Sequence, residues 1–332
     1  MSFSSAPKKL RIGVMGCANI AIRSVIPAIC SGDEFELVAV ASRDKTKAES
    51  VAKTFACQPL DGYEALLDAD VDAIYMPLPT GMHEEWVLKS LEVGKHLLVE
   101  KSFGLTLAAT RAMCDAAEKH KLVVMENFMY RQHRQQKIVA DLLSSEAIGA
   151  VRLFKASFGF PPLDPANFRY DAALGGGALL DAGAYTINAA SHFLGSSLEV
   201  LSATLRIDEE RGVDVGGTAA LVADGRIPVQ LAWGFDNFYQ CGVDVWGQKG
   251  RLTTNRTFTA GPGFRPTVRV ETLEQTTETL LPADQHFANR LSLFASRIGT
   301  GAVGESTREV LEQSRLLDRV RSVALHCGDV RG

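Results

Sequence analysis

The sequence lacks the features by which several large classes of protein are recognised. It contains no run of about 18 apolar residues, so we expect no membrane-spanning helix. Residues 1–9 lack the apolar core of a secretion signal. The formal net charge of −4 leaves no basic excess, which argues against a nucleic-acid partner. These absences predict a cytoplasmic protein that binds neither membrane nor nucleic acid.

Metal-binding and redox motifs are also missing. The six cysteines form no CxxC pair and show no spacing typical of a metal site, so we predict reduced thiols and no metal. They are scattered along the chain: Cys17, Cys30, Cys57, Cys114, Cys241 and Cys327. No internal repeat or low-complexity segment is present, which argues against a repeat architecture.

What is present indicates a globular protein of two domains. A chain of 332 residues, 46% hydrophobic and 22% charged, is too long for one ordinary core and has a soluble composition. In the first third, short β-branched runs alternate with helical patterns, which predicts a doubly wound parallel sheet. Beyond about Tyr130, alternating strands joined by turns predict a mostly antiparallel sheet that is open on one face.

We therefore predict an α/β fold. Residues 1–127 form a dinucleotide-binding Rossmann domain, and residues 128–332 form an α+β domain for substrate binding and oligomerisation. In the first domain the pattern predicts strands at 10–14, 37–41, 73–76, 96–99 and 122–126, and helices at 21–30, 45–54, 84–93 and 107–119. In the second it predicts strands at 151–157, 200–206, 218–222, 229–235, 242–246 and 268–272, and helices at 137–144, 183–194, 286–298 and 305–327.

A glycine-containing loop follows the first predicted strand. Gly16, Ala18 and Ala21 fit the spacing G-x-G-x-x-G/A, with alanine in two positions. Small residues there allow a tight turn and a close approach of the backbone to a pyrophosphate, and the following helix offers free N–H groups to that anion. We therefore predict a dinucleotide site formed by Gly16, Cys17, Ala18, Asn19 and Ile20.

The end of the second predicted strand distinguishes the two nicotinamide cofactors. An NAD enzyme usually carries Asp or Glu here to bind the ribose 2′-hydroxyl, whereas this chain has Ser42 and Arg43. A guanidinium group binds a 2′-phosphate through two hydrogen bonds. These residues favour NADP(H) as cofactor. The alternative is that Arg43 is only a solvated charge in a turn.

The loop after the strand at 73–76 is held extended by two prolines. We predict that Pro77, Leu78, Pro79 and Thr80 run beside the ribose and the nicotinamide. His83, at the start of the next helix, is either a base or, in our preferred interpretation, a residue that shapes the cofactor pocket.

Lys101 ends the run Leu98-Leu-Val-Glu100-Lys101, which is typical of a buried parallel strand. Open α/β sheets bind ligands at the carboxyl ends of their strands, and a buried ammonium group is costly unless it is compensated. Lys101 is therefore a candidate for stabilising charge on a substrate oxygen, with Glu100 beside the cofactor. The alternative is a lysine that leaves the sheet into solvent.

A second concentrated signal is the block Gly175-Gly-Gly177, followed by Asp181 and Tyr185. Asp181 and Tyr185 are four residues apart and would share one face of a helix. An ammonium group beside a phenol lowers its pKa and makes it a usable general acid. We therefore predict that Lys101, Asp181 and Tyr185 are catalytic. The alternative for Tyr185 is a half-buried core tyrosine.

Together these motifs resemble the Gfo/Idh/MocA oxidoreductase family over nearly the whole chain. The matching features are the glycine loop, Glu100-Lys101, residues 126–131 and the glycine block through Tyr185. The resemblance implies that Lys101 lies beside the nicotinamide and that Tyr185 contacts the oxygen of the reacting carbon. Two positions depart from the pattern: Ser102 stands where many members have proline, and Tyr185 where many have histidine.

Within this family the chain is similar to nucleotide-sugar ketoreductases of deoxysugar pathways, which reduce a C-3 ketone on a dTDP-linked sugar. The similar stretches are Arg23 with residues 26–28, residues 77–80 and residues 234–266. The resemblance implies substrate contacts by Arg23, Lys101, Tyr185, Phe235, Tyr239, Gln240 and Arg256, and cofactor contact by Arg169. Arg251 and Arg265 could also donate to a diphosphate. The aromatic residues could equally pack on a neighbouring strand.

The predicted function is NADPH-dependent reduction of a keto group, at C-3, on a nucleotide-linked deoxysugar. Lys101 stabilises the oxygen's charge, Tyr185 or Lys101 donates the proton, and Asp181 orients sugar hydroxyls or the lysine. Two alternatives stay open: a free-sugar, polyol or dihydrodiol dehydrogenase of the same family, and a non-catalytic sensor that binds NADP. The open sheet face predicts a homodimer or homotetramer.

Overall fold

The structure is a computed structural model that describes residues 9–195 and 197–328, and it divides into two compact units. The first unit comprises residues 9–104, Ala108–Asn127 and Phe287–Leu311. The second comprises Leu105–Leu107, Phe128–His286 and residues 312–328. The units change at 127/128, where we placed the domain boundary. Residues 287–311, however, belong to the first unit, whereas we had assigned them to the second domain.

A six-stranded, fully parallel sheet forms the centre of the first unit. Its order is β3-β2-β1-β4-β5-β6, which is the strand order of the Rossmann fold. The strands are β1 (Leu10–Met15), β2 (Phe35–Ser42), β3 (Gln58–Asp61), β4 (Ala73–Met76), β5 (His96–Val99) and β6 (Val124–Glu126). Strand order reverses between β1 and β4, and ligands of such sheets bind at the carboxyl ends of the strands next to this point.

Helices connect these strands and complete the core of the first unit. They are η1 (Ala21–Val25), α1 (Ile26–Ser31), α2 (Lys45–Phe55), α3 (Glu64–Leu67), η2 (Thr80–Met82), α4 (His83–Glu92), α5 (Leu107–His120), α8 (His286–Thr300) and the first part of α9 (Val303–Val323). Val310 of α9 packs in the same buried cluster as Met76 and Val99 of the sheet. This packing explains why the late residues 287–311 belong to the first unit.

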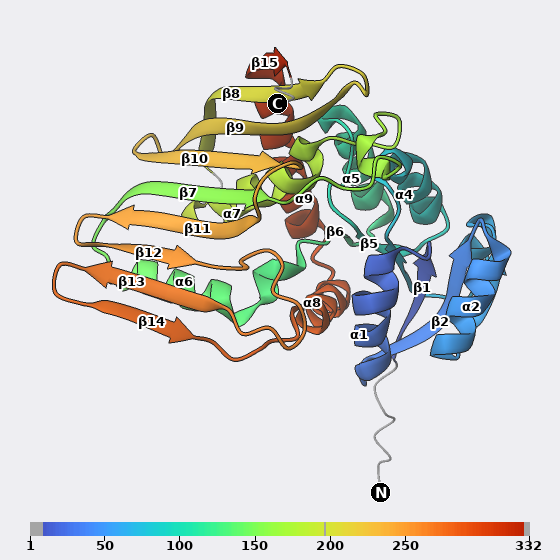
Figure 1. Cartoon of the computed structure of the whole chain (residues 1–332). Coiled ribbons are helices and arrows are strands. Elements are labelled where there is room, and N and C mark those ends of the chain that lie inside the picture. The colour runs from blue at the N-terminus through green and yellow to red at the C-terminus, as the bar shows by residue number, and fades with distance from the viewer. Residues whose placement is uncertain (1–8, 196, 329–332) are drawn as a thin grey trace, which may run out of the picture. The chain divides into compact units, whose positions relative to one another are not determined.

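A nine-stranded sheet forms the second unit, and Figure 1 shows its strands side by side from β15 to β14. All neighbouring pairs are antiparallel except β7 with β10 and β8 with β15. The strands are β7 (Val151–Gly159), β8 (Leu198–Asp208), β9 (Val213–Ala223), β10 (Ile227–Gly234), β11 (Gln240–Gly247), β12 (Gly250–Thr254), β13 (Thr267–Thr272), β14 (Thr276–Leu280) and β15 (Ala324–Gly328).

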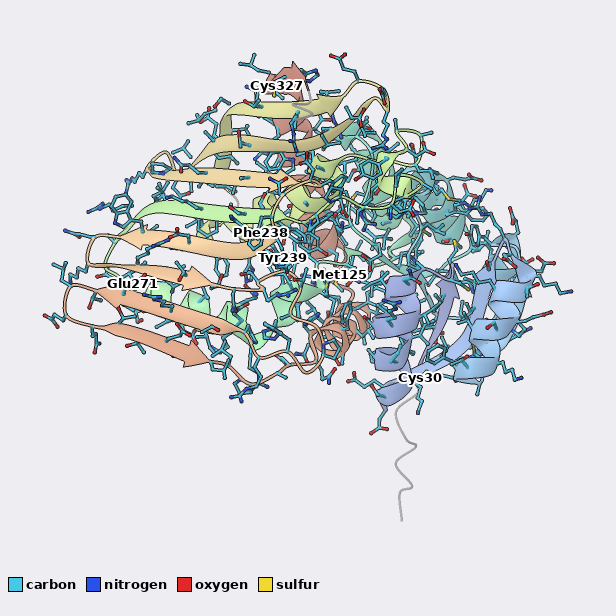
Figure 2. All side chains as sticks on the ribbon, viewed as in Figure 1. Cys30, Met125, Phe238, Tyr239, Glu271 and Cys327 are labelled. Carbon is cyan, nitrogen blue, oxygen red and sulfur yellow. The ribbon has the colours of Figure 1, made fainter. Side chains whose placement is uncertain are left out.

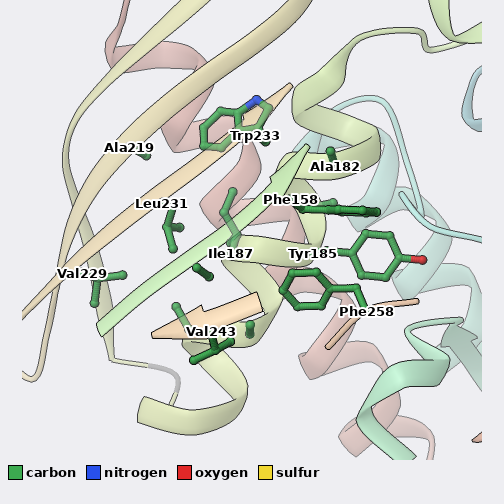
Figure 3. Close-up of a cluster of buried hydrophobic side chains, with 14 of the residues drawn as sticks. Phe158, Ala182, Tyr185, Ile187, Ala219, Val229, Leu231, Trp233, Val243 and Phe258 are labelled. Carbon is green, nitrogen blue, oxygen red and sulfur yellow. The ribbon is translucent and has the colours of Figure 1, made fainter. Parts of the chain in front are cut away.

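One face of this sheet is covered and the other is open. The covered face carries buried apolar side chains such as Phe158, Val229 and Leu231, which pack with Ile187 of α7 (Figure 3). The intervening side chains, such as Lys155, are only partly buried. The helical segments of this unit are η3 (Met129–Gln132), α6 (Arg134–Ser144), η4 (Phe168–Tyr170), η5 (Leu179–Gly183), α7 (Ala184–Leu194) and the second part of α9.

The predicted fold class is confirmed: a parallel Rossmann sheet and a mostly antiparallel sheet with helices. One element was wrong. The last predicted helix ends at Val323, and Ala324–Gly328 form β15 because they pair with β8. Among the strands and α-helices, β3, α3, β12 and β14 were not predicted, and neither were the short helical turns η2, η3 and η4. In the described part of the chain no helix is long and apolar enough to cross a membrane.

Candidate active site

The predicted glycine loop lies at the carboxyl end of β1. Gly16 has φ +117°, and a Cβ atom there would lie 3.0 Å from Leu78 Cδ2, so only glycine fits without strain. The Gly16 N–H donates to the Ala41 carbonyl at 2.9 Å, and the first helical hydrogen bond runs from Ile22 to Ala18. The following helix therefore begins at the loop with its early N–H groups directed there, which fits a pyrophosphate.

The end of β2 leaves a cation exposed. Ser42 is buried and its hydroxyl accepts the Asp44 N–H at 3.1 Å, while the Asp44 carboxylate accepts the Lys47 N–H and begins α2. Arg43 is exposed, with its guanidinium carbon 5.9 Å from the centre of the Tyr63 ring. Because the nearby carboxylate is used by the helix, this edge fits a 2′-phosphate better than a ribose hydroxyl.

The loop after β4 is rigid and mostly buried, with Pro77, Leu78 and Thr80 buried and Pro79 partly so. His83, the first residue of α4, has no exposed surface. Its ring nitrogens face only backbone carbonyls, those of Leu78, Ser102 and Phe103. A ring without exposed surface does not reach a ligand, so His83 can act on a cofactor only through the loops that it contacts.

Lys101 lies two residues beyond β5, in the segment Glu100–Gly104 that we call the lysine loop. Val99 pairs with Met76 of β4 and with Glu126 of β6, so the three strands end level with one another. The Lys101–Ser102 peptide bond is cis. The side chain of Lys101 is partly buried. The lysine therefore stands at the ligand-binding edge of the sheet, as its sequence context predicts.

Two carboxyl groups lie close to the lysine loop. Glu100 accepts hydrogen bonds from the Tyr75 hydroxyl at 2.8 Å and from the Asn127 amide at 2.6 Å. Glu126 is 5% exposed and accepts the Phe103 N–H at 2.9 Å. Burial raises the pKa of Glu100, and it raises the pKa of Glu126 to about 8; hydrogen bonds and the charge of Lys101 oppose both shifts.

In the second unit, η5 and α7 carry the predicted catalytic pair. The π-helical turn η5 holds Asp181, whose carboxylate pairs with the Arg169 Nε at 2.6 Å. At its start, the Leu179 N–H donates to the Asp214 carboxylate at 2.6 Å. Burial raises the pKa of Asp214 to about 6. The predicted cofactor residue Arg169 is thus the ion-pair partner of the predicted catalytic residue Asp181.

Tyr185 combines a buried ring with a hydroxyl that leaves the core. Its ring is 6% exposed and meets the rings of Phe128, Phe158 and Phe258 with centroids 5.4–5.5 Å away. Figure 3 shows the hydroxyl pointing away from the rest of the cluster, and it lies 3.8 Å from the Met129 sulfur. The ring is part of the hydrophobic core, which fixes where the hydroxyl is presented.

Residues 234–266 place three of the predicted substrate residues around one cleft. A cleft of about 580 Å³ is lined by Tyr239, Gln240 and Arg256 among others. The Arg256 guanidinium lies 4.3 Å over the Tyr239 ring and donates to its hydroxyl at 3.1 Å. Arg251 lines the same cleft but donates two hydrogen bonds to the Asp244 carboxylate. Fewer of its N–H groups are therefore left to bind a diphosphate.

The prediction that Phe235 contacts substrate was wrong. Phe235 has no exposed surface, and its ring stacks on Phe160 at 5.2 Å. The reason is visible in the alternation of the strand: Val229, Leu231 and Trp233 are buried, and Phe235 continues that phase. The exposed aromatic of this loop is Phe238, 88% exposed and next to Tyr239 in Figure 2.

Several site residues were not given a role by sequence reasoning. Glu126 ends an apolar strand just as Glu100 does, so its position at the same edge could have been inferred. Asp214 contacts η5 through a pairing distant in the sequence, and no local pattern marks it.

Arg23, predicted to bind substrate, is exposed on η1 in the first unit.

Fold and geometry together define a class: an enzyme with a dinucleotide-binding Rossmann unit and a second unit built on an antiparallel sheet. Residues 10–128 match the model of an oxidoreductase family with an NAD-binding Rossmann fold, and residues 137–253 match the GFO/IDH/MocA C-terminal domain. The chain belongs to the GFO/IDH/MocA oxidoreductase family, as the resemblance of its motifs implied.

Relatives and solved structures are similar over almost the full length. A dTDP-3,4-didehydro-2,6-dideoxy-alpha-D-glucose 3-reductase of Saccharopolyspora spinosa is 40% identical, covering 97% of this chain and 99% of the relative. The enzyme of that name from Streptomyces violaceoruber is 42% identical, covering 96% of each. KijD10, a 3-ketoreductase from Actinomadura kijaniata solved with NADP and TDP-benzene, has a TM-score of 0.94 at 38% identity, covering 97% of this chain and all of that one, 100%.

Proposed function

We propose that this protein uses NADPH to reduce the C-3 keto group of a dTDP-linked deoxysugar. Relatives that carry that activity in their names are similar from end to end. A similar solved structure binds NADP together with TDP-benzene. The observation that carries the proposal is the position of Lys101, partly buried, two residues beyond β5 at the ligand edge of a Rossmann sheet.

The first unit supplies the cofactor contacts. The loop around Gly16 and the helix that follows bind the pyrophosphate through N–H groups. The exposed Arg43 binds the 2′-phosphate, which selects NADP(H) over NAD(H). The loop of Pro77 and Leu78, held extended and buried, lies along the ribose and nicotinamide. When bound, NADPH supplies the hydride that reduces the carbonyl carbon.

Lys101 stabilises the charge that appears on the substrate oxygen as its carbon is reduced. An ammonium group fixed in a partly dry site stabilises such charge by roughly 3–4 kcal/mol. Glu100 belongs to the lysine loop, and Glu126 accepts the Phe103 N–H of that loop. The charge of Lys101 lowers the pKa of each carboxyl group, against the opposing effect of burial. Both carboxyl groups are held by hydrogen bonds beside Lys101, and burial favours their neutral form.

Tyr185 donates the proton to that oxygen. Its ring packs against three aromatic neighbours, which fixes the direction of the hydroxyl. Little side-chain entropy is therefore lost when the hydroxyl reacts. Asp181 acts through its ion pair with Arg169, which fixes the guanidinium toward cofactor or sugar hydroxyls. A tyrosine-to-phenylalanine variant and a lysine-to-alanine variant of the Actinomadura kijaniata enzyme have each been solved with TDP-benzene and NADP.

Two lysines that flank β5 test the proposal. Lys101→Ala should lower kcat on the dTDP-linked keto sugar by at least about a hundredfold, because it removes a transition-state contact. NADPH affinity should change little. Lys95, at the other end of β5, donates to the carbonyls of Ala69 and Val71 and is the matched control. Near-normal turnover by Lys101→Ala, or an equal loss in Lys95→Ala, would reject the assignment.

A free-sugar dehydrogenase is the second candidate, because a D-xylose 1-dehydrogenase (NADP(+)) of Haloferax volcanii is 34% identical over 90% of this chain. Calorimetric titration of the NADP complex with dTDP and with free sugars separates the two. Binding of dTDP supports the nucleotide-sugar reading. Binding of a free aldose with no affinity for dTDP would replace it.

The protein is further proposed to act in the cytoplasm as a homodimer or homotetramer. The support is the open face of the second unit's sheet, where Trp246 is 60% exposed and hollows of about 520 and 390 Å³ lie among partly polar side chains. A sheet face that no helix of the same chain covers is commonly covered by the same face of a second, symmetry-related copy.

A further inference from the structure

His83 lies between two loops that sequence reasoning treated separately. β4 and β5 pair in parallel, and the loop of Leu78 and the lysine loop leave their carboxyl ends side by side. His83 begins α4 directly after the first of these loops, and its side chain has no exposed surface. A fully buried ionisable side chain that no catalytic step uses calls for a physical explanation.

The imidazole ring joins the two loops by hydrogen bonds to their backbones. Nε2 lies 2.8 Å from the Leu78 carbonyl oxygen in residues 77–80, which we call the cofactor loop. Nδ1 lies 3.1 Å from both the Ser102 and the Phe103 carbonyl oxygens in the lysine loop. All three partners are acceptors, so each ring nitrogen is placed to donate. The ring therefore connects the two loops.

The number of N–H groups on the ring decides which of these carbonyl groups it can bind. A neutral imidazole carries one N–H and can donate to one loop only, whereas the imidazolium donates to both. Burial lowers the pKa of His83, and the hydrogen bonds to the three carbonyl groups oppose that shift. In the neutral ring the two loops therefore compete for one N–H, so a change in the position of one carbonyl alters the contact with the other.

The lysine loop is also held from its far side, so a shift at Ser102 or Phe103 is not absorbed within the loop. The Phe103 N–H donates to Glu126, and the Glu126 carbonyl accepts a hydrogen bond from Arg290 of α8. Gly104 has no room for a Cβ, which would lie 2.6 Å from the Thr110 hydroxyl. The backbone on the carboxyl side of Lys101 is thus fixed between His83 and Glu126.

The cofactor loop is fixed as tightly against the pyrophosphate turn. The Leu78 side chain sits where a Cβ on Gly16 would be only 3.0 Å away. The Leu78 carbonyl, which His83 contacts, belongs to the same residue. A shift of Leu78 therefore changes the clearance over the turn of Gly16, and one buried ring connects that turn to the lysine loop.

We infer that His83 is a positioning residue that couples the cofactor loop to the lysine loop, so that NADPH affinity and the placement of Lys101 depend on one side chain. The inference deepens the proposed function, since it rests on the role of Lys101 for its effect on turnover. Its effect on cofactor affinity does not depend on that role. A displacement of Lys101 by about 1 Å is enough to lower turnover by up to about a hundredfold.

The test compares His83→Gln with His96→Gln. His96 is a partly buried histidine of the first unit, at the other end of β5, where its Nδ1 accepts the Val123 N–H at 2.9 Å. Glutamine at 83 can donate to one loop but cannot span both. Fluorescence titration gives the NADPH Kd, steady-state kinetics gives kcat and the sugar KM, and hydrogen exchange of the cofactor-free protein follows residues 78–80 and 102–104.

We expect His83→Gln to raise the NADPH Kd and to lower kcat, each by about tenfold or more, and to speed exchange in both loops. The sugar KM should move less than kcat. His96→Gln should lower the free energy of unfolding without moving any of these. A folded His83→Gln protein with unchanged Kd and loop exchange would overturn the inference, and so would equal effects of the two variants.

Other outcomes are also decisive. If neither His83→Gln nor His83→Asn folds while His96→Gln does, the ring is required for folding rather than for coupling, and the inference is overturned. If Lys101→Ala keeps its turnover, the proposed role of Lys101 fails. The coupling would then still be supported by a raised NADPH Kd and faster exchange in both loops of His83→Gln.

Discussion

At the scale of single residues, Glu126 links the site to stability. Its pKa of about 8 in the folded protein exceeds the ordinary value of 4.5 because the carboxyl group is buried. A raised pKa favours folding at low pH, so this contribution is complete below about pH 4.5 and is lost as pH rises through about 8. Between about pH 4.5 and pH 8 the unfolded chain ionises this carboxyl group while the folded protein keeps it protonated, so the folded state loses stability across that range.

Glu126→Gln should remove this dependence. Urea unfolding at about pH 5 and about pH 8 should show the wild-type protein losing roughly 1–4 kcal/mol relative to the variant over that range. The glutamine carbonyl can still accept the Phe103 N–H, so the hydrogen bond is kept. The exposed Glu84 gives the control variant Glu84→Gln. Parallel curves for Glu126→Gln and wild type would contradict the account.

Tyr185 gives a second prediction at this scale. Tyr185→Phe keeps the packed ring and removes only the hydroxyl, so kcat should fall by about a hundredfold while the fold is unchanged. Tyr130, which lies in the same cluster and donates to Asn188 at 2.7 Å, provides the control Tyr130→Phe. Full activity in Tyr185→Phe would assign the proton to Lys101 or to a sugar hydroxyl.

At the scale of secondary structure, η5 begins at a contact that the local sequence does not contain. The Asp214 carboxylate of β9 accepts the Leu179 N–H, in the way an N-cap residue does for its own helix. We expect Asp214→Ala to lower the free energy of unfolding by about 1–3 kcal/mol, because a buried N–H loses its acceptor. Asp214→Asn keeps an acceptor oxygen and should lose less. Equal losses measured by urea unfolding would contradict this role.

The helices and strands also show which elements a local sequence pattern can predict. Periodicity predicted the long elements, because amphipathic helices and apolar parallel strands repeat over many residues. It missed β14, whose five residues are all exposed and so carry no alternation. It also extended the last helix through Ala324–Gly328, where pairing with β8 decides the structure. Elements that are short, exposed or formed by distant pairing were beyond the local signal.

For the site, the sequence predicted which residues end strands but not what their side chains contact. Lys101 was placed at the carboxyl edge from its apolar run alone, and that placement is confirmed. The ring of His83 could be located near the cofactor loop, yet its link to Ser102 and Phe103 depends on strand pairing. Phe235 was misassigned because its aromatic character was weighed above the phase of its strand.

At the scale of the whole molecule, the open sheet face predicts self-association. Trp246 on β11 points away from the covered core, since its neighbours Val243 and Val245 are buried. Trp246→Glu should weaken the oligomer, because a charge at such an interface is left unpaired. Leu273, fully exposed in the turn between β13 and β14, gives the control Leu273→Glu. Light scattering after gel filtration measures both, and an unchanged mass for Trp246→Glu would contradict the proposal.

The most direct test of the central claim follows the hydride itself. NADPH deuterated at the transferable position is incubated with the protein and a dTDP-linked 3-keto deoxysugar, and the product is examined by NMR. The account predicts one deuterium at C-3 of the nucleotide-linked sugar from the wild-type protein, formed at least about a hundredfold more slowly by Lys101→Ala. Deuterium at another carbon, or transfer only to sugars without a nucleotide, would contradict it.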